Sequence, residues 1–304
     1  MKNKVLFIVN PTSEKIKKKE FESVIKDYSK KHNFDWQVYY TEKSDTGKDI
    51  QKIIENFNHD LVIAGGGDGT INLVASQLIG SGVELGIIPA GSANGLAYNL
   101  DIPDYLEEAL EVSLTARAKP FDAILINDQI HCFHLSDIGL NARVVKRFEQ
   151  EGSKGLTGYG KQMFREFFEK KTVITFSIDA QGKKKKYKAE MLVIANARSF
   201  GTGAVINPLG SVDDGEFEII MVRLYSWWSI FYLFRMFIFG KLEKMKYVKV
   251  IKTNKADIVL DKPHDLQTDG EIVNEIERLK IRILPSALKI RYNKAAKSDA
   301  GYLP

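Results

Sequence analysis

The sequence predicts an α/β domain with a parallel sheet, followed by a β-rich domain that forms an antiparallel sandwich. In residues 1–122, short apolar runs of strand character alternate with segments of helical periodicity, which is typical of a parallel sheet with helices on both faces. From residue 123 onwards, most apolar runs have strand character and are joined by turns. We therefore expect domains at residues 1–122 and 123–285, with the tail 286–304 returning to the first domain.

Four apolar runs and the helical patterns between them predict the first domain. Strands are expected at Val5–Val9, Phe34–Tyr40, Leu61–Ala64 and Leu85–Ile88, and helices at Lys15–Lys31, at Gly47–Phe57 and from Thr70 onwards. In such sheets, ligands bind at the carboxyl ends of the strands.

The second domain contains mainly strands. They are expected at Ala123–Ile126, Ile130–Leu135, Val173–Ile178, Glu190–Ala195, Glu216–Val222, Lys246–Ile251, Ala256–Leu260 and Leu279–Ile283, with helices near Thr157–Glu169 and Ser226–Phe239.

Composition and charge exclude several classes of protein. Lys and Arg (44) exceed Asp and Glu (39) by only five in 304 residues, so no nucleic-acid partner is expected. The single cysteine, Cys132, excludes an internal disulfide and is expected as a buried strand thiol. No signal peptide is recognised after Met1, and the apolar segment Leu224–Phe239 is shorter than a membrane span and contains Arg235. These features predict a cytoplasmic location.

A loop of four glycines around one aspartate, Gly65–Thr70, follows the third predicted strand. Glycines let the backbone approach a pyrophosphate and adopt positive φ at no cost, and a helix N-terminus attracts an anion. Asp68 would repel a phosphate unless a divalent cation lies between them, so the loop indicates a Mg-nucleotide site. The alternative is a plain turn in which Asp68 caps the helix.

A second loop of the same kind, Pro89–Gly95, directly follows the fourth predicted strand. Ser92 and Asn94 can offer a hydroxyl and an amide beside backbone donors, although Ser92 could equally be a plain helix cap. Asn10-Pro11 at the end of the first strand would complete a triangle of loops around a nucleotide, or else form an ordinary Asx turn.

These elements together resemble the diacylglycerol kinase catalytic-domain family of lipid kinases, which includes sphingosine kinases and small bacterial lipid kinases. The resemblance continues in order through four further segments, Leu135–Ala142, Gly201–Pro208, Val212–Phe217 and Gln267–Glu271. The Gly66–Thr70 element alone is shared with NAD kinases and phosphofructokinases, which implies a first domain of their type. The resemblance also implies an enzyme that uses ATP and Mg2+ to phosphorylate a lipid hydroxyl.

The resemblance further implies roles for individual residues. Asp68 would bind Mg2+, directly or through water, and Glu271 would be the general base, with Asp269 beside it in the catalytic group. A structural metal would lie at Asp213 and Glu216. The residues implied in nucleotide binding are Asn10, Thr41, Gly65, Gly66, Gly67, Gly69, Thr70, Ser92 and Asn94.

Alternatives remain open at several of these positions. From the residues alone, Asp269-Gly270 and Asp213-Asp214-Gly215 are more typical of turns. Gly95 and Leu73 stand where many diacylglycerol kinases carry Asp and Glu, and the loop before Gly95 is closer to that of sphingosine kinases. A kinase of a soluble acceptor such as NAD, or a non-catalytic nucleotide- or lipid-sensing protein, would fit the same glycine loop.

A lipid kinase must reach a membrane surface, and two segments could provide this contact. Lys183–Lys186 follows Gln181-Gly182 at an expected hairpin tip, where it could also be a solvated strand start. The aromatic helix Trp227–Phe239 could be interfacial or packed into the β domain. We expect peripheral membrane association, and a homodimer is left open. Gly155–Gln162 has a phosphate-loop spacing, but no strand leads into it, so it is interpreted as a helix-entry loop.

Overall fold

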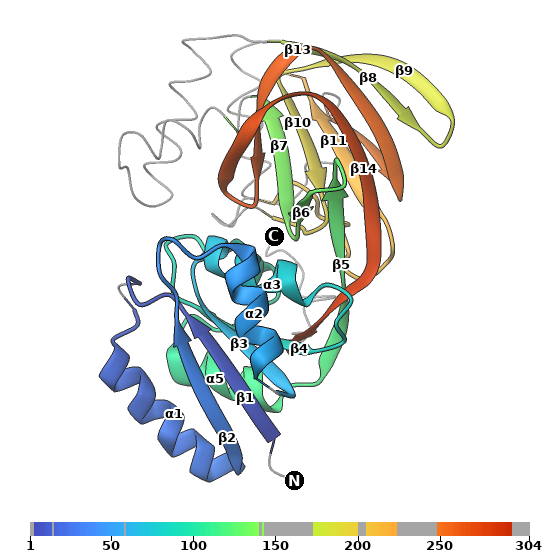
Figure 1. Cartoon of the computed structure of the whole chain (residues 1–304). Helices are drawn as coiled ribbons and strands as arrows, with labels where there is room; N and C mark the ends of the chain where they lie inside the picture. Colours follow the sequence, from blue (N-terminus) through green and yellow to red (C-terminus); the bar gives the residue numbers. More distant parts are fainter. Residues whose placement is uncertain are drawn as a thin grey trace, which may run out of the picture. The chain divides into compact units, whose positions relative to one another are not determined.

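The computed structural model describes residues 3–13, 15–57, 59–139, 142, 173–199, 205–223 and 248–293 (Figure 1). The chain divides into two compact units, of which unit 1 comprises residues 1–121 and 286–304 and unit 2 comprises residues 122–285. The domain bounds predicted from the sequence lie within one residue of this division. Strands β5 (Ala118–Ile126) and β14 (Glu271–Arg291) each contribute residues to both units.

Unit 1 is built on a parallel sheet with the strand order β2-β1-β3-β4-β14. Its strands are β1 (Asn3–Val9), β2 (Phe34–Tyr40), β3 (Leu61–Gly66), β4 (Glu84–Pro89) and the end of β14, where Lys289 and Ile290 pair with Glu84 and Leu85. The chain moves outward from β1 in opposite directions, to β2 on one side and to β3 on the other. The crevice between the carboxyl ends of β1 and β3 is therefore the topological switch point, where ligands bind in open α/β sheets.

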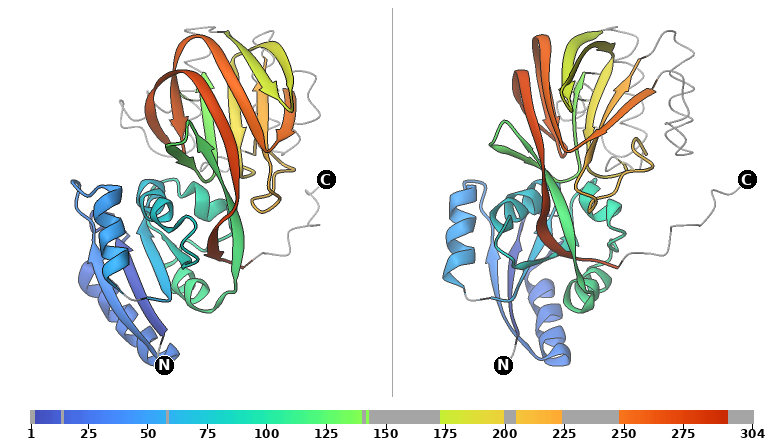
Figure 2. Two further views of the ribbon diagram at one scale, coloured as in Figure 1. Left: turned by 45° about the vertical axis from the view of Figure 1, so that its right-hand side comes forward. Right: turned by 90° about the vertical axis from the view of Figure 1, so that its right-hand side faces the viewer.

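Helices lie on both faces of this sheet (Figure 2). The helices of unit 1 are α1 (Lys18–His32), α2 (Gly47–Asn56), α3 (Asp68–Leu78), α4 (Gly95–Asn99) and α5 (Leu106–Thr115). Helices α2 and α3 pack together on one face, and α1 contacts α5 on the other, where Lys31 and His32 both reach Glu111. Because both faces are covered, β1 and β3 are apolar along most of their length and almost wholly buried.

Two elements of unit 1 differ from the sequence predictions. Helix α3 begins at Asp68 instead of Thr70, because Gly67 is already extended and acts as the N-cap. Helix α5 was not singled out from the sequence, although Ala109 and Leu110 give it a buried face.

Unit 2 is an antiparallel β-sandwich, as predicted. One layer has the order β12-β11-β10-β7-β13-β14, and β8 and β9 extend β13 while β5 and β6 extend β14. Its further strands are β6 (Ile130–Cys132), β7 (Leu135–Gly139), β8 (Ile174–Ala180), β9 (Lys183–Ala189), β10 (Met191–Ala195), β11 (Phe217–Val222), β12 (Val248–Thr253) and β13 (Lys255–Thr268).

The long strand β13 joins the two layers. Residues 256–260 pair with β8, whereas residues 266–268 pair with β7, and the register with β14 shifts between Val259 and His264. Pro263 lies within this shift and cannot donate a ladder hydrogen bond, which is why the irregularity is tolerated there.

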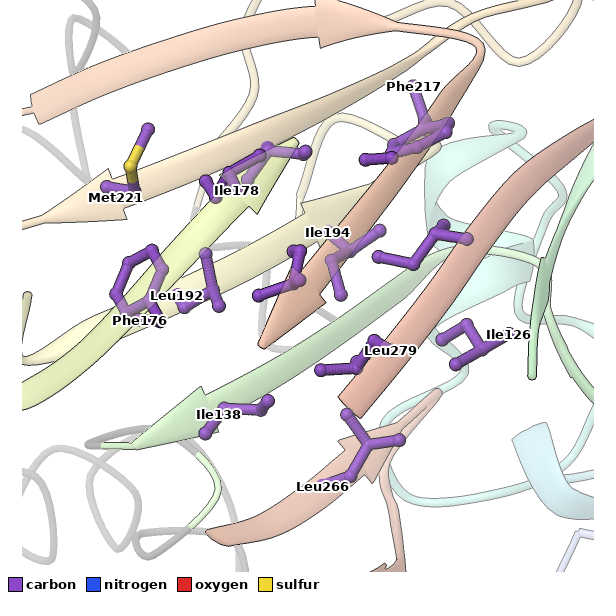
Figure 3. Packing of buried hydrophobic residues seen from close by; sticks show 14 of the residues in the cluster. Ile126, Ile138, Phe176, Ile178, Leu192, Ile194, Phe217, Met221, Leu266 and Leu279 are labelled. Atoms are coloured by element: carbon purple, nitrogen blue, oxygen red, sulfur yellow. The ribbon is translucent and has the colours of Figure 1, made fainter. Parts of the chain in front are cut away.

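Apolar side chains from both layers fill the interior of the sandwich (Figure 3). Phe176 and Ile178 of β8 face Leu192 and Ile194 of β10 across the core, and Leu279 of β14 is fully buried with them. Alternation of buried and outward side chains along β8 reflects the period of two that a strand imposes.

The remaining differences concern short or polar segments of unit 2. The predicted strand Ile130–Leu135 is divided between β6 and β7, and the predicted strand start at Lys183 belongs to a full strand, β9. The predicted helices near Thr157–Glu169 and Ser226–Phe239 lie outside the described residues. Among the helices that the structure describes, none has the length and apolar character needed to span a membrane.

Candidate active site

The carboxyl ends of the unit 1 strands are tied together by backbone hydrogen bonds. The N–H of Asn10, directly after β1, donates to the Gly65 carbonyl at 2.8 Å, and the N–H of Ala90, directly after β4, donates to the Gly66 carbonyl at 2.7 Å. The Thr41 N–H donates to the carbonyl of the last β1 residue at 2.9 Å. The predicted residues Asn10, Thr41, Gly65 and Gly66 therefore lie together at the edge that contains the switch point.

The glycines of the two loops are required for close packing. A Cβ on Gly66 would lie 2.7 Å from the Thr70 hydroxyl oxygen, and a Cβ on Gly91 would lie 2.5 Å from the Gly67 Cα. The loops after β3 and β4 thus touch backbone to backbone at Gly67 and Gly91. None of these three glycines has a positive φ, so the expectation that they are needed for that conformation is wrong for them. They leave room for a second backbone.

Asp68 joins the two loops. One carboxylate oxygen accepts the Gly95 N–H at 2.9 Å and the other accepts the Leu96 N–H at 3.2 Å. Asp68 therefore caps the start of α4, and the alternative that it caps its own helix is wrong. Gly69 and Thr70 complete the first turn of α3 behind it.

The Asp68 carboxylate retains the capacity to bind a cation. An ionised carboxylate offers about four acceptor positions, and the two amides use two of them. Mg2+ is usually held by one or two carboxylates together with water and phosphate oxygens, so a single partly exposed aspartate beside a phosphate loop fits this ion. In the part of the chain that the structure describes, no three His, Cys, Asp or Glu side chains gather as metal ligands.

The predicted residues of the second loop divide into two kinds. Asn94 is 6% exposed and left-handed (φ 52°), and its side chain closes the loop by accepting from the Gly91 N–H at 2.8 Å and donating to the Gly91 carbonyl at 3.0 Å. Ser92 is exposed at the tip of the loop. Its hydroxyl is therefore the better placed of the two for a ligand.

Asn10 forms the Asx turn that the sequence analysis left as an alternative. Its side-chain oxygen accepts from the Thr12 N–H at 2.9 Å and from the Thr12 hydroxyl at 2.8 Å. The Ser13 hydroxyl donates to the Ala90 carbonyl, which links this turn to the second loop. The loops after β1, β3 and β4 are therefore one connected structure.

The predicted catalytic pair of unit 2 lies at a tight hairpin. Asp269 (φ 50°) and Gly270 (φ 98°) form a two-residue turn between the paired residues Thr268 and Glu271. Positive φ at both positions is the type I′ geometry that matches the twist of a hairpin. The turn interpretation is therefore correct for the backbone, and it leaves Glu271 exposed as the first residue of β14.

Asp269 is an anchor inside the protein. It is 2% exposed, and its oxygens accept backbone N–H groups from Phe133 at 2.8 Å, His134 at 2.9 Å and Leu135 at 3.0 Å. The His134 Nδ1 lies 3.3 Å away. Burial raises the pKa of the Asp269 carboxyl, but the His134 ring and the backbone hydrogen bonds outweigh it and hold this pKa below its usual value.

This anchoring was not visible in the sequence. His134 was not singled out, because its partner is 135 residues away along the chain. Cys132, predicted as a buried strand thiol, is fully buried on β6, and burial together with the neighbouring Asp269 raises its pKa well above the usual value. Asp269 lies two residues before Glu271, so its hydrogen bonds fasten the turn from which Glu271 begins β14.

The structure gives the two residues of the predicted structural metal site separate partners. Asp213 accepts a hydrogen bond from the Ser211 hydroxyl. Glu216 lies 3.6 Å from the Lys252 ammonium, which also lies 2.7 Å from Asp214 and 3.7 Å from Glu218. Lys252, which sequence reasoning missed, therefore supplies the positive charge at this turn.

Several predicted features fall on residues outside those described. They are the loop Gly155–Gln162, the helix Trp227–Phe239 and residues 201–204 of the segment Gly201–Pro208.

Two protein-family models match the chain, one over most of unit 1 and the other over most of unit 2. The model of the diacylglycerol kinase catalytic domain matches residues 4–126, and the model of the YegS C-terminal NAD kinase beta sandwich-like domain matches residues 136–292. A probable lipid kinase YegS-like protein of Yersinia enterocolitica is 29% identical over 240 residues, which cover 76% of this chain and 78% of that protein. A probable lipid kinase YegS of Salmonella typhimurium is 27% identical over 241 residues, with the same two coverages.

The fold has a solved counterpart. The crystal structure of a diacylglycerol kinase from Bacillus anthracis matches with a TM-score of 0.78 at 22% identity, over 96% of this chain and 98% of that one. At this identity the likeness shows the fold, and it agrees with the α/β and sandwich units described above.

Proposed function

Since the chain belongs to the family of lipid kinases with a diacylglycerol kinase catalytic domain, we propose that it transfers the γ-phosphate of Mg-ATP to a hydroxyl group of a lipid. The choice of nucleotide, metal ion and acceptor is our proposal. The observation that carries it is the meeting of two glycine-rich loops at Gly67 and Gly91, with Asp68 bound between them at the carboxyl ends of β3 and β4, on the sheet edge that contains the switch point.

Phosphate binding is assigned to the backbone of the two loops and the first turn of α3. The residues concerned are Gly66, Gly67, Gly69, Thr70 and Ser92, with Asn10 and Thr41 at the neighbouring strand ends. A helix N-terminus and side-chain-free backbone let phosphate oxygens approach closely. Asp68 directs its oxygens towards the amides of α4, and this reduces its repulsion of a bound phosphate.

Asp68 would also hold the magnesium ion, directly or through water. Held there, the ion would supply positive charge that neutralises the charge developing during transfer. Phosphoryl transfer depends mainly on positioning and charge neutralisation, so few protein groups are required.

Glu271 is assigned as the general base. Its exposed carboxylate begins β14 at the end of a turn that Asp269 fastens to the Phe133–Leu135 segment. A carboxylate held in this way can accept the proton of the lipid hydroxyl as its oxygen attacks the γ-phosphorus. The bond to the β-phosphate oxygen then breaks, and ADP leaves.

The test is transfer of labelled γ-phosphate from Mg-ATP to lipids in mixed micelles. We expect Glu271→Gln to lower the transfer rate by about 10²–10⁴-fold. ATP binding and the midpoint of urea unfolding should stay unchanged, because the side chain is exposed. Glu277→Gln is the matched control, since it makes the same change at another exposed glutamate of β14.

The acceptor panel separates the competing functions. It contains diacylglycerol, monoacylglycerol, sphingosine, ceramide and phosphatidylglycerol, with NAD as the soluble acceptor. Label on one lipid supports the proposal and identifies the acceptor class. Label on NAD alone would replace it with a soluble-acceptor kinase, and ATP binding without any transfer would indicate a sensing protein.

A further inference from the structure

Strand β9 carries an unusual concentration of positive charge. Five of its seven residues, Lys183, Lys184, Lys185, Lys186 and Lys188, are lysines, and all five are exposed. The chain as a whole has an excess of five basic over acidic residues, so this one strand carries as much charge as the entire net balance. Outside β9 the positive and negative charges of the chain cancel.

The β9 lysines form no ion pair with the residues that the structure describes. Among the described residues, no carboxylate lies within 4.0 Å of their ammonium groups, even though Lys184 pairs in register with Asp179. Lys252 on β12 provides the contrast, because three carboxylates surround its ammonium. The charge of β9 is therefore available to an external partner.

The positive charge lies on both sides of the strand and continues onto β12. Lys184, Lys186 and Lys188 occupy one side of β9, and Lys183 and Lys185 occupy the other with Tyr187, because side chains alternate along a strand. Tyr187 packs against Phe176, with ring centroids 6.1 Å apart. The Lys249 ammonium of β12 lies 4.8 Å from the Tyr187 ring centroid, so Lys249 adds to the positive charge on the side of Lys183 and Lys185.

Protection of a strand edge explains part of this pattern. Among the described strands, β9 pairs only with β8, and lysines on an edge strand discourage pairing with another molecule. One or two lysines would be sufficient for that purpose. The five lysines of β9, together with Lys249, are more than edge protection requires.

We propose that β9 and Lys249 form the surface by which this protein binds an anionic lipid bilayer. The proposal rests on the proposed function, because a lipid acceptor is presented by a membrane. Lysines near an anionic bilayer surface each strengthen binding by about fivefold at physiological salt, and several together give stable but reversible attachment. Flexible lysine side chains suit a fluid surface of anionic head groups, which offers no fixed geometry.

The test compares two triple variants of the full chain by sedimentation with vesicles. The first carries Lys184→Gln, Lys186→Gln and Lys188→Gln on β9. The control carries Lys19→Gln, Lys26→Gln and Lys48→Gln, which remove the same charge from exposed positions of α1 and α2. The vesicles contain phosphatidylcholine alone, or phosphatidylcholine with about 30% phosphatidylserine.

We expect the β9 variant to bind the anionic vesicles about 100-fold more weakly than the unmodified protein, and the control to stay within about threefold. Binding of the unmodified protein should weaken as salt is raised, because salt screens the attraction. Phosphate transfer to a lipid in neutral detergent micelles should be equal for all three proteins, which separates membrane attachment from catalysis.

Two results would overturn the proposal. They are equal binding of the unmodified protein to neutral and anionic vesicles, and unchanged binding of the β9 variant to the anionic vesicles. If vesicle binding behaves as expected but no lipid is phosphorylated in micelles, the surface stands and the proposed kinase function is wrong.

Discussion

Asp68 and Asp269 are both followed by glycine, and both accept hydrogen bonds from backbone amides. They differ in the number of amides that they accept and in how far their side chains are exposed. Asp68 accepts two amides from the start of α4 and is partly exposed. Asp269 accepts three amides, lies 3.3 Å from a histidine nitrogen and is 2% exposed.

The difference separates a carboxylate that is still accessible from one whose oxygens are used within the fold. Asp68 accepts two amides and is partly exposed, so its carboxylate keeps acceptor positions for a cation. The oxygens of Asp269 are used within the fold. Two similar Asp-Gly pairs in the sequence therefore lie in unlike environments, and their substitution should have unlike effects.

The largest effect is expected on stability, at Asp269. Asp269→Ala removes the acceptor for three buried N–H groups, which should lower the free energy of unfolding by about 3–5 kcal/mol. Urea unfolding measures this loss. Asp261→Ala, at an exposed position of the preceding strand β13, should change the midpoint little. A normal midpoint with abolished transfer would make Asp269 a catalytic group and remove the contrast with Asp68.

A smaller stability effect and a large activity effect are expected at Asp68. Asp68→Ala should cost about 1–2 kcal/mol of stability, because it removes the acceptor for two amides whose hydrogen bonds to Asp68 are part-buried. Transfer of phosphate to lipid should fall by at least about 100-fold. Asp68→Asn keeps one acceptor oxygen and should recover part of the stability but not the transfer. Recovery of both would reduce Asp68 to a structural role.

The smallest effect concerns acid stability. Because the pKa of Asp269 is lower in the folded protein than the ordinary 3.8, its ionised form stabilises the fold above that pH, and this contribution is lost as the pH falls through the folded-state pKa. The difference in unfolding free energy between the unmodified protein and Asp269→Asn should therefore narrow between about pH 5 and pH 3. Urea titrations at several pH values measure this difference in unfolding free energy. A difference that does not change with pH would contradict the lowered pKa of Asp269.

Most of the fold could be predicted where apolar runs are short and bounded. Phe34–Tyr40 was predicted with the bounds that β2 has, because an aromatic and apolar run ends sharply at Thr41. β13 and β14 were predicted only at their apolar centres, Ala256–Leu260 and Leu279–Ile283, yet they extend to 14 and 21 residues. Their polar ends are strands because neighbouring strands pair with them, and tertiary pairing of this kind leaves no local pattern.

The candidate site, too, could be predicted only in part from the sequence. That the loops at Gly65–Thr70 and Pro89–Gly95 lie together could be predicted, because carboxyl ends of neighbouring parallel strands share one edge. The acceptor roles of the two aspartates could not. Asp68 accepts hydrogen bonds from amides that lie 27 and 28 residues later in the sequence, and Asp269 accepts them from amides that lie 134 to 136 residues earlier.

The late return of the chain to unit 1 has a consequence for synthesis on the ribosome. Strand β4 receives its outer neighbour only from Lys289 and Ile290, and the carbonyls of Ser113 and Leu114 at the end of α5 are bound by the Arg291 guanidinium. These partners are translated after the whole of unit 2. Unit 1 therefore keeps an open sheet edge while unit 2 is synthesised. Although unit 1 begins the chain, it is the last unit to be completed during translation.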